Sequence, residues 1–328
     1  MLVGIRLIIL RMLIGALAAL GPIGSAWASE NGQQVYRLGI RGPVAGIRPE
    51  PGVYLQSNKF YYEADAGADL QIPDAGRVIA GVKAKAAVEI PIALWMTDLK
   101  IAGGNFGLAV GVPFGRLRVK AGSEFSIDDL DLAIGALLEE KQFMVGDPIV
   151  NPTIGWNAGN FHWNINGQVN IPIGDYERDR LVNLSYNRWA ADLTGAFTWL
   201  NRENGREVSA AAGVTFNGEN NATNYQTGTE SHFEVAVQQW LSKQLSVGLV
   251  GYHYQQISGD SGEGAVLGDF KGRVTALGPV IGFSFDLGDT TIFANARWYR
   301  EFNTRNRLDG DAGYLTFNIP LGGSHNGG

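Results

Sequence analysis

Residues 162–173 read HWNINGQVNIPI, and the stretch alternates between two kinds of side chain. One set of alternate positions is apolar apart from a glycine: Trp163, Ile165, Gly167, Val169, Ile171 and Ile173. The other set is rich in amides: His162, Asn164, Asn166, Gln168, Asn170 and Pro172. Because successive side chains of a β-strand point to opposite faces, the stretch predicts a strand with one apolar and one polar face.

The same alternation recurs along the chain, for example in 206–217, where Val208 and Val214 alternate with Glu207 and Thr215. It predicts twelve strands, at 52–64, 78–101, 106–123, 149–157, 161–174, 188–200, 206–217, 232–241, 244–258, 271–285, 290–302 and 312–322. A soluble β-sandwich also alternates, with its apolar face in the core, so periodicity alone does not choose between a sandwich and a barrel.

The connections between these strands sort by length. Short turns fall at 102–105, 158–160, 201–205, 242–243 and 286–289, and long polar loops at 65–77, 124–148, 175–187, 218–231, 259–270 and 303–311. Short periplasmic turns and long extracellular loops are typical of outer-membrane barrels, whereas a sandwich has no reason to sort its loops. The sequence therefore predicts an all-β fold, an antiparallel transmembrane β-barrel over residues 52–322.

Two segments leave alternatives open. Residues 78–101 are long for one strand and contain Pro91, so an extra hairpin would give fourteen strands instead of twelve. Residues 29–51 are rich in glycine and proline, and they form either a periplasmic lead or a plug folded into the lumen.

The two ends of the chain differ from the rest. Residues 1–28 carry Arg6 and Arg11 as their only charges, an apolar run, and the small-residue site Ala26-Trp27-Ala28, which together predict a removable signal peptide. Beyond residue 28, no run approaches the roughly 20 apolar residues of a spanning helix. Residues 323–328 are expected to form a flexible tail. Export and a barrel together predict the outer membrane of a Gram-negative bacterium.

Composition excludes several classes of protein. The chain has no cysteine, which excludes a disulfide framework. The formal net charge is −6 and becomes −8 when Arg6 and Arg11 leave with residues 1–28, so no nucleic-acid partner is expected. The four histidines are too scattered for a recognisable metal site, and neither a metal nor a cofactor is expected.

The inward positions of such a barrel are the candidate functional residues. About twelve strands leave room for a solute path or a plug. The candidates for a substrate path along the lumen are Asn164, Asn166, Gln168, Asn170, Arg297 and Glu301. An opening in the wall is expected where a proline kinks a strand, near Pro91 or Pro279.

Catalysis is the competing hypothesis. Gly259-Asp260-Ser261-Gly262 with His253 upstream is the one candidate nucleophile and base, and it would make the protein an outer-membrane lipase or esterase. The spacing and the repeated strand pattern do not match a serine-protease fold, and no enzyme activity is expected.

A series of short motifs resembles a known family. They include Pro172-Ile173-Gly174-Asp175-Tyr176, Asn183-Leu184-Ser185-Tyr186-Asn187-Arg188-Trp189, Phe216-Asn217-Gly218-Glu219-Asn220, Thr223 to His232, Gly248 to Gln256, and Trp298-Tyr299-Arg300-Glu301-Phe302. Over most of residues 36–321 the chain is similar to the family named for the meta-pathway of phenol degradation, the SphA-like outer-membrane porins, which are similar to long-chain fatty-acid transporters.

The resemblance implies a channel or transporter for uptake of hydrophobic or aromatic small molecules. The alternative left open by the polar lumen positions is a general diffusion porin for small polar solutes. The expected partners are outer-membrane lipid, the transported molecule and the barrel-assembly machinery.

Overall fold

The structure is a computed structural model, and it describes residue 30 and residues 34–72, 76–127, 132–265, 268–269, 271–288 and 290–322. The predicted signal peptide at 1–28 and the predicted tail at 323–328 lie outside the described residues. Across the described ranges, no helix is long and apolar enough to cross a membrane.

The described residues form sixteen strands. They are β1 (Gly52–Ile72), β2 (Gly76–Ile101), β3 (Gly104–Gly111), β4 (Phe114–Ile127), β5 (Leu132–Val145), β6 (Ile149–Ala158), β7 (Phe161–Asn170), β8 (Ala190–Asn201), β9 (Arg206–Asn217), β10 (Glu219–Asn220), β11 (Tyr225–Gln226), β12 (Glu230–Trp240), β13 (Leu245–Gln256), β14 (Arg273–Leu287), β15 (Thr290–Arg305) and β16 (Asp309–Gly322).

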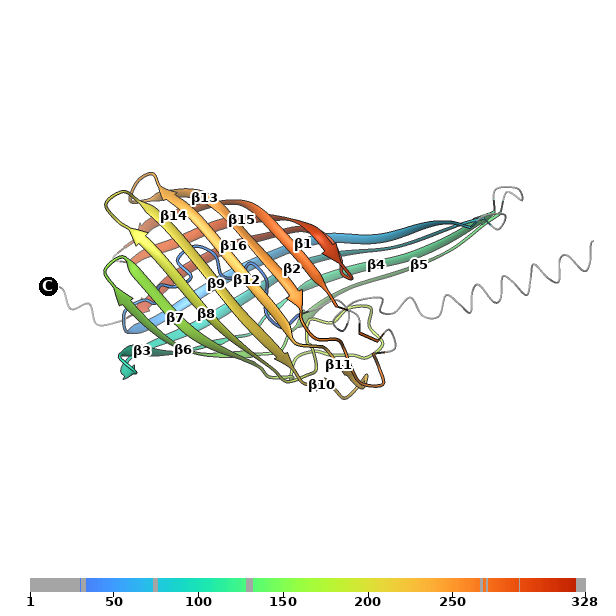
Figure 1. Cartoon of the computed structure of the whole chain (residues 1–328), viewed down its shortest axis with the longest axis horizontal. Coiled ribbons are helices and arrows are strands. Elements are labelled where there is room, and N and C mark those ends of the chain that lie inside the picture. Colours follow the sequence, from blue (N-terminus) through green and yellow to red (C-terminus); the bar gives the residue numbers. More distant parts are fainter. Residues whose placement is uncertain are drawn as a thin grey trace, which may run out of the picture.

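Twelve of these strands close into one antiparallel barrel. The order is β1-β16-β15-β14-β13-β12-β9-β8-β7-β6-β3-β2, and β2 pairs with β1 to complete the ring (Figure 1). The predicted twelve-stranded barrel is confirmed. Closure gives every strand of the ring a neighbour on both edges, so the ring itself has no open edge.

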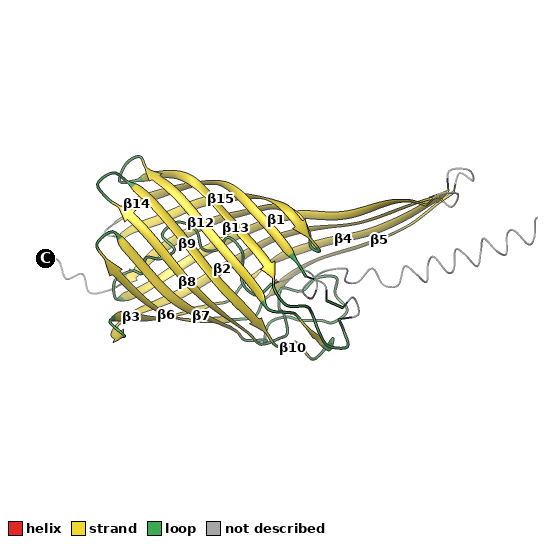
Figure 2. Ribbon diagram, viewed as in Figure 1, coloured by secondary structure: helices red, strands yellow, loops and turns green. Residues whose placement is uncertain are grey.

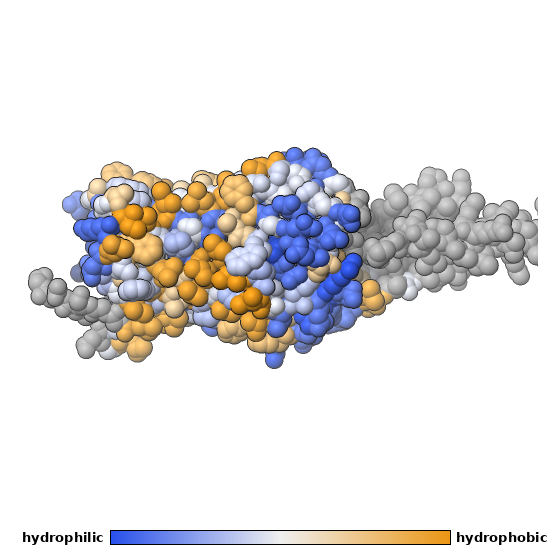
Figure 3. All heavy atoms as spheres, turned by 90° about the horizontal axis from the view of Figure 1, so that it is seen from below, coloured by the Kyte–Doolittle hydropathy of each residue, from blue (hydrophilic) through white to orange (hydrophobic). Residues whose placement is uncertain are grey.

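The faces of the strands are inverted relative to a soluble sandwich. Along β8, Thr198 is fully buried inside the barrel, whereas Leu193 points outward and is 58% exposed. In Figure 3, apolar side chains dominate the middle of the visible face, and hydrophilic ones gather toward the end with the long connections. Polar residues therefore line the inside of this wall and apolar residues cover its outside, which excludes the sandwich.

Four strands lie outside the ring: β10 and β11, which pair with each other, and β4 and β5. The strand expected at 106–123 is divided into β3 and β4, and β5 was not predicted. β4 and β5 pair with each other, and β4 pairs with the first half of β2, so β1, β2, β4 and β5 run together beyond the end of the barrel (Figures 1 and 2). The loops expected at 65–77 and 124–148 are therefore wrong, because most of these residues are strand. The loop expected at 303–311 is also mostly strand, since β15 continues to Arg305 and β16 begins at Asp309.

Prolines separate two pairs of successive strands, and neither separation is in the stretch 78–101 where one was expected. Pro113 separates β3 from β4, and Pro148 lies between β5 and β6. The register shifts by one residue between the pair Phe114–Val145 and the pair Gly111–Ile149, as at a β-bulge. Pro91 instead lies inside the continuous strand β2, where its neighbour changes from β3 to β4.

Neither of the two prolines expected to open the wall does so. Pro91 pairs with Ser57 of β1, and Pro279 pairs with Leu249 of β13. On the other edge of each strand, pairs in unchanged register lie on both sides of the proline. The prediction of an opening near Pro91 or Pro279 is wrong. Each proline lacks one backbone N–H donor, but the strands on both sides of it stay in register.

Strand pairing in the wall stops at β5. One edge of β5 pairs with β4, and the described residues place no strand on its other edge. The connection 171–189 lies there instead: Asp175 donates its backbone N–H to the carbonyl of Val145 at 2.8 Å, and Leu181 donates to Glu140 Oε2 at 2.9 Å. We call this boundary between β5 and residues 171–189 the seam.

The inverted faces lead to a stability prediction. We expect Leu193→Arg to lower the free energy of unfolding in a lipid bilayer by about 2–4 kcal/mol, because the charge would enter hydrocarbon. Gln168→Arg is the matched control, since its side chain faces the lumen, and it should cost much less. Denaturant unfolding in vesicles measures both, and equal costs would contradict the assignment of faces.

Candidate functional site

Residues 34–51, here called the lumen segment, lie inside the barrel and lead to the start of β1 at the end with the short turns (Figure 1). The backbone of the segment bonds to side chains of the wall. Gly39 donates its N–H to Glu234 Oε1 at 2.9 Å, Val44 donates to Glu207 Oε1 at 2.6 Å, and Gly46 donates to Thr198 Oγ1 at 2.8 Å. An irregular segment lacks the ladder bonds of a strand, so these wall groups satisfy its buried amides.

Two glycines let the segment approach the wall closely. A Cβ at Gly46 would overlap the backbone of β8 at Phe197 and Thr198. Gly39 has a φ of +77°, in the left-handed region that favours glycine, and it packs on the rings of Tyr299 and Tyr314. The glycines of this segment therefore allow its backbone to pack directly against the wall inside the barrel.

Arg48 joins the segment to two of the predicted lumen residues. Its Nη2 donates to Asn164 Oδ1 at 2.9 Å and to Asn166 Oδ1 at 2.6 Å, and its Nε donates to Thr153 Oγ1 at 3.0 Å. Asn164 also donates from Nδ2 to the carbonyl of Ala45 at 2.9 Å. Burial lowers the pKa of Arg48 to about 9, with Arg41 as the second cause, so the guanidinium remains charged at neutral pH.

Arg297 and Glu301 also face inward, and both are buried. Arg297 Nη1 donates to the carbonyls of Gly39 at 2.8 Å and Ile40 at 3.1 Å, so it holds the segment from the opposite side of the lumen. Glu301 does not bond the segment. Its carboxylate accepts hydrogen bonds from the hydroxyls of Tyr62 and Tyr252, each at 2.8 Å.

Gln168 and Asn170 lie on the inner face of β7 but have different partners. Gln168 accepts a weak bond of 3.4 Å from Asn151, and Asn170 donates from Nδ2 to Asp147 Oδ2 at 3.0 Å. The structure therefore brings Asn164, Asn166 and Arg297 together around the lumen segment, while Gln168, Asn170 and Glu301 bond the wall.

Asp147 is an anchor of the seam that sequence reasoning missed. This buried carboxylate, between β5 and β6, accepts hydrogen bonds from the backbone N–H of Gly174 at 3.0 Å and of Tyr186 at 2.8 Å, and from Ser185 Oγ at 2.6 Å. With the bond from Asn170, it ties both ends of the connection 171–189 to the wall. Nothing in the periodicity marks Asp147, because it lies in a break between strands.

Other missed residues lie on the polar faces of strands. Glu207 and Glu234 supply the carboxylates that bind the lumen segment, and His232 bonds Asp192 at 2.9 Å while its ring stacks on Tyr36 at 3.4 Å. Burial raises the pKa of Tyr36 well above its usual range, with Glu234 as the next cause, so its hydroxyl stays protonated. The alternation of the sequence predicts that these side chains face inward, but it does not predict their contacts with residues 34–51.

The first described residue reaches the long connections. Glu30 is buried, and its carboxylate contacts Arg188 Nη1 at 3.3 Å and accepts bonds from Asn220 at 2.8 Å and Thr223 at 2.7 Å. Arg188 and Asn220 belong to the connections 171–189 and 218–229. Glu30 therefore lies at the opposite end of the barrel from Gly52.

One part of the inner wall is apolar rather than amide-rich. Toward the long connections, the inner faces of β1, β2, β4 and β5 carry a buried cluster, here called the apolar wall: Phe60, Val88, Ile90, Leu117, Val119 and Met144. Leu38 of the lumen segment and Val182 and Leu184 of the connection 171–189 belong to the same cluster. The same cluster continues along the inner faces of β12 to β16, through residues such as Val250, Val274 and Ala312, whereas the inner faces of β6 to β9 are polar.

The sequence matches the model of one protein family over residues 67–317, and the description of that family is "Putative MetA-pathway of phenol degradation". The chain belongs to this family. The predicted family membership is confirmed, and the matched residues include β2, β4 and β5 of the apolar wall and both sides of the seam, but not Phe60. No curated protein matches the chain in sequence.

A solved structure supports the fold of this family member. An outer membrane channel from Pseudomonas putida F1 is similar, with a TM-score of 0.61 and 15% sequence identity, over 87% of this chain and 99% of that channel. A FadL homologue from Pseudomonas aeruginosa gives a TM-score of 0.43 at 10% identity, over 85% of this chain and 92% of its own, a score too low to carry an argument. At these identities the likeness concerns the fold alone.

The family member's one candidate catalytic pair is not assembled. His253 lies on β13, and its Nδ1 is 2.9 Å from Thr275 Oγ1. Ser261 lies in the connection 257–272, bonded through its backbone to Gln226. The described residues contain no hydrogen bond between the two, and they contain no cluster of three or more metal-binding side chains.

The hydrogen bonds of Arg48 lead to a prediction about how firmly the lumen segment is held. Arg48→Ala removes the three hydrogen bonds that this charged donor makes to side chains of the wall, so we expect the amides of Gly39, Val44 and Gly46 to exchange hydrogen about 10-fold faster or more. Arg202→Ala, in an exposed turn, is the control and should leave their exchange unchanged. Unaltered exchange in Arg48→Ala would show that the segment is held elsewhere.

The Asp147 contacts predict how the seam is held closed. Asp147→Asn presents amide donors to groups that are themselves donors, so the connection 171–189 should open more often. We expect trypsin to cleave after Arg178 or Arg180 about 10-fold faster in the folded protein, since cleavage follows the population of the open form. Asp98→Asn, an exposed acid of β2 near the short turns and far from both cleavage sites, is the control and should leave the rate unchanged.

Proposed function

We propose that the protein is a channel of the Gram-negative outer membrane for uptake of hydrophobic or aromatic small molecules. Family membership, the closed barrel and the apolar outer surface support this proposal. In this placement the short turns face the periplasm and the long connections face the exterior. The phenol-degradation description of the family agrees with an aromatic substrate class.

The observation that carries the proposal is the apolar wall. A barrel that conducts only polar solutes has no need for an apolar inner face, because water wets the lumen. Here Phe60, Ile90, Leu117 and Met144 gather on the inner side of the strands that project beyond the ring. A small apolar molecule arriving from the exterior would lose water-exposed surface on this wall, at about 25 cal/mol per Å², by taking the place of the side chains of Leu38, Val182 or Leu184 that cover it.

The lumen segment favours a lateral exit over an axial one. A molecule moving straight through the barrel would have to displace residues bonded to Arg297, Glu234, Glu207 and Thr198. A molecule leaving through the seam would displace the contacts of the connection 171–189 with β5 and with Asp147. On the outer side of the seam, Phe143 and Val145 are exposed, so the path would end in an apolar environment such as lipid hydrocarbon.

The second candidate is a general diffusion porin for small polar solutes. The amide and hydroxyl groups of β6 to β9, including Asn164, Asn166 and Thr198, favour it because they suit water and polar solutes. These groups are engaged with the lumen segment, so this function would require the segment to leave the lumen. Transport is proposed rather than ester hydrolysis, since Ser261 and His253 do not bond each other.

A reversible lock tests the lateral route. The chain has no cysteine, so the pair Val145→Cys and Asp175→Cys would introduce one disulfide across the seam, where residues 145 and 175 bond each other. In vesicles we expect the oxidised variant to lose at least about 10-fold in the rate of uptake of a phenol or similar aromatic probe, and reductant to restore the rate.

The control is the pair Val237→Cys and Leu249→Cys, which joins two strands that are already paired. It should have no effect in either redox state. Aromatic uptake that continues at the normal rate with the seam locked would refute the lateral route. Equal flux of polar sugars and aromatics through the unmodified protein would favour the diffusion porin.

A further inference from the structure

Two rows of outward-facing side chains cross the wall beside the projecting strands. Strand register places Trp298, Gly313, Tyr61, Ala87, Arg116 and Phe143 in one row, here called the aromatic row. One step toward the long connections it places Arg300, Asp311, Glu63, Lys85, Arg118 and Lys141 in the next, here called the charged row. A change from aromatic to charged side chains marks the boundary between hydrocarbon and lipid headgroups.

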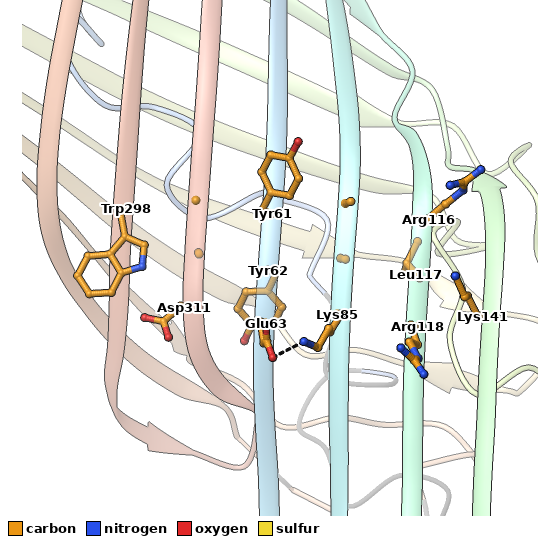
Figure 4. A pocket seen from close by; sticks show the side chains of 14 residues that line it. Tyr61, Tyr62, Glu63, Lys85, Arg116, Leu117, Arg118, Lys141, Trp298 and Asp311 are labelled. Carbon is orange, nitrogen blue, oxygen red and sulfur yellow. Dashed lines mark ion pairs between the residues drawn. The ribbon is translucent and has the colours of Figure 1, made fainter.

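A groove lies across these rows on the outside of the barrel. Its volume is about 450 Å³, and its outward-facing lining includes Tyr61, Lys85, Arg116, Arg118, Lys141 and Trp298. The groove exists because Ala87 and Gly313, on either side of Tyr61, fill little space, and a Cβ at Gly313 would meet no atom closer than 3.9 Å. In Figure 4, Trp298 and Asp311 lie on one side of Tyr61 and Glu63, and the basic side chains lie on the other.

The basic side of the groove has more charge than its acids neutralise. Outward-facing basic residues gather on β2, β4 and β5: Lys83, Lys85, Arg116, Arg118, Lys120 and Lys141. Lys85 pairs with Glu63 at 2.5 Å, and Arg118 and Lys120 share Glu139 at 2.5 and 3.0 Å. Among the described residues, Arg116 and Lys141 have no ion pair, although they lie next to Arg118.

From this arrangement we infer that the groove binds a phosphorylated lipid of the outer leaflet, with its phosphate on Arg116, Arg118 and Lys141. In a Gram-negative outer membrane the lipid of this chemistry is lipopolysaccharide. Guanidinium groups match phosphate because they donate several hydrogen bonds in one plane. The inference rests on the membrane location proposed above and does not depend on which solute the barrel transports.

The surroundings of the groove favour a lipid over a soluble anion. On the side of the groove away from the long connections, the next outward-facing row includes Leu315, Phe114 and Val145, with the ion pair of Lys59 and Glu89 between Leu315 and Phe114. An acyl chain could lie on Phe143, Phe114 and Val145 on one side of this neutral pair, or on Trp298 and Leu315 on the other, while its headgroup stays at the charged row. A soluble phosphate would use the basic residues and leave this apolar surface uncovered.

The test compares lipid retention by purified full-length protein in detergent. Native mass spectrometry would count bound lipid after addition of purified lipopolysaccharide or of the same lipid with its phosphates removed. The variant R116Q/R118Q/K141Q should retain the phosphorylated lipid about 10- to 100-fold less, as expected when three cations near a lipid surface are lost. The dephosphorylated lipid should bind the unmodified protein and the variant equally weakly.

The matched control removes the same charges at the other end of the barrel. Arg202, Arg206 and Lys243 are exposed in or next to short turns, so R202Q/R206Q/K243Q changes the net charge by the same amount and should retain lipid normally. Gly313→Leu fills the groove and keeps every charge, and it should also weaken retention. β-sheet circular dichroism would confirm that each variant is folded.

Several results would overturn the inference. They are equal retention by R116Q/R118Q/K141Q and the unmodified protein, equal loss in R202Q/R206Q/K243Q, or normal retention by Gly313→Leu. Displacement of the lipid by millimolar inorganic phosphate would show that a soluble anion is the better ligand. Uptake of an aromatic probe in vesicles should be unchanged in R116Q/R118Q/K141Q, so failure of the transport proposal and failure of the lipid site give different outcomes.

Discussion

Pairing of β1 with β16 is the contact on which the rest of the structure depends. The ladder runs from Val53–Gly322 to Asp65–Asp309 and joins the two ends of the sheet. In hydrocarbon no water is available to an unpaired N–H or C=O, so an open sheet would leave both edges unsatisfied. Closure also creates the lumen, and with it the enclosed polar surface that holds residues 34–51.

Closure does not extend to the whole wall. Above the breaks at Pro113 and Pro148, β4 and β5 leave the ring, and the edge of β5 is covered by a connection rather than a strand. A buried carboxylate, Asp147, supplies part of the bonding that a neighbouring strand would otherwise give. The barrel thus has one place where the wall is held by side-chain contacts, and the apolar wall lies next to it.

The sequence predicted the ring and its polarity because period-two alternation is a local property of each strand. It placed twelve strands, the short turns and the inward faces of Asn164, Asn166, Arg297 and Glu301. Prediction of β5 failed for a related reason: residues 132–138 read LAIGALL, in which apolar and polar positions do not alternate, so the local signal of a strand is absent. The contacts of residues 34–51 could not be predicted, because they join an irregular segment to carboxylates 150 to 200 positions away, with no periodicity to mark them.

The path of the lumen segment sets an order for assembly. Glu30 is held among the long connections, and Gly52 begins β1 at the far end, so the intervening chain passes along the inside of a closed ring. If β16 paired with β1 first, this stretch would have to thread through a finished barrel past Arg297 and Glu234. If the stretch instead lies on the concave side of the growing sheet, the final pairing wraps the wall around it. The first residues of β1 therefore connect two events, the seating of the segment and the last step of closure.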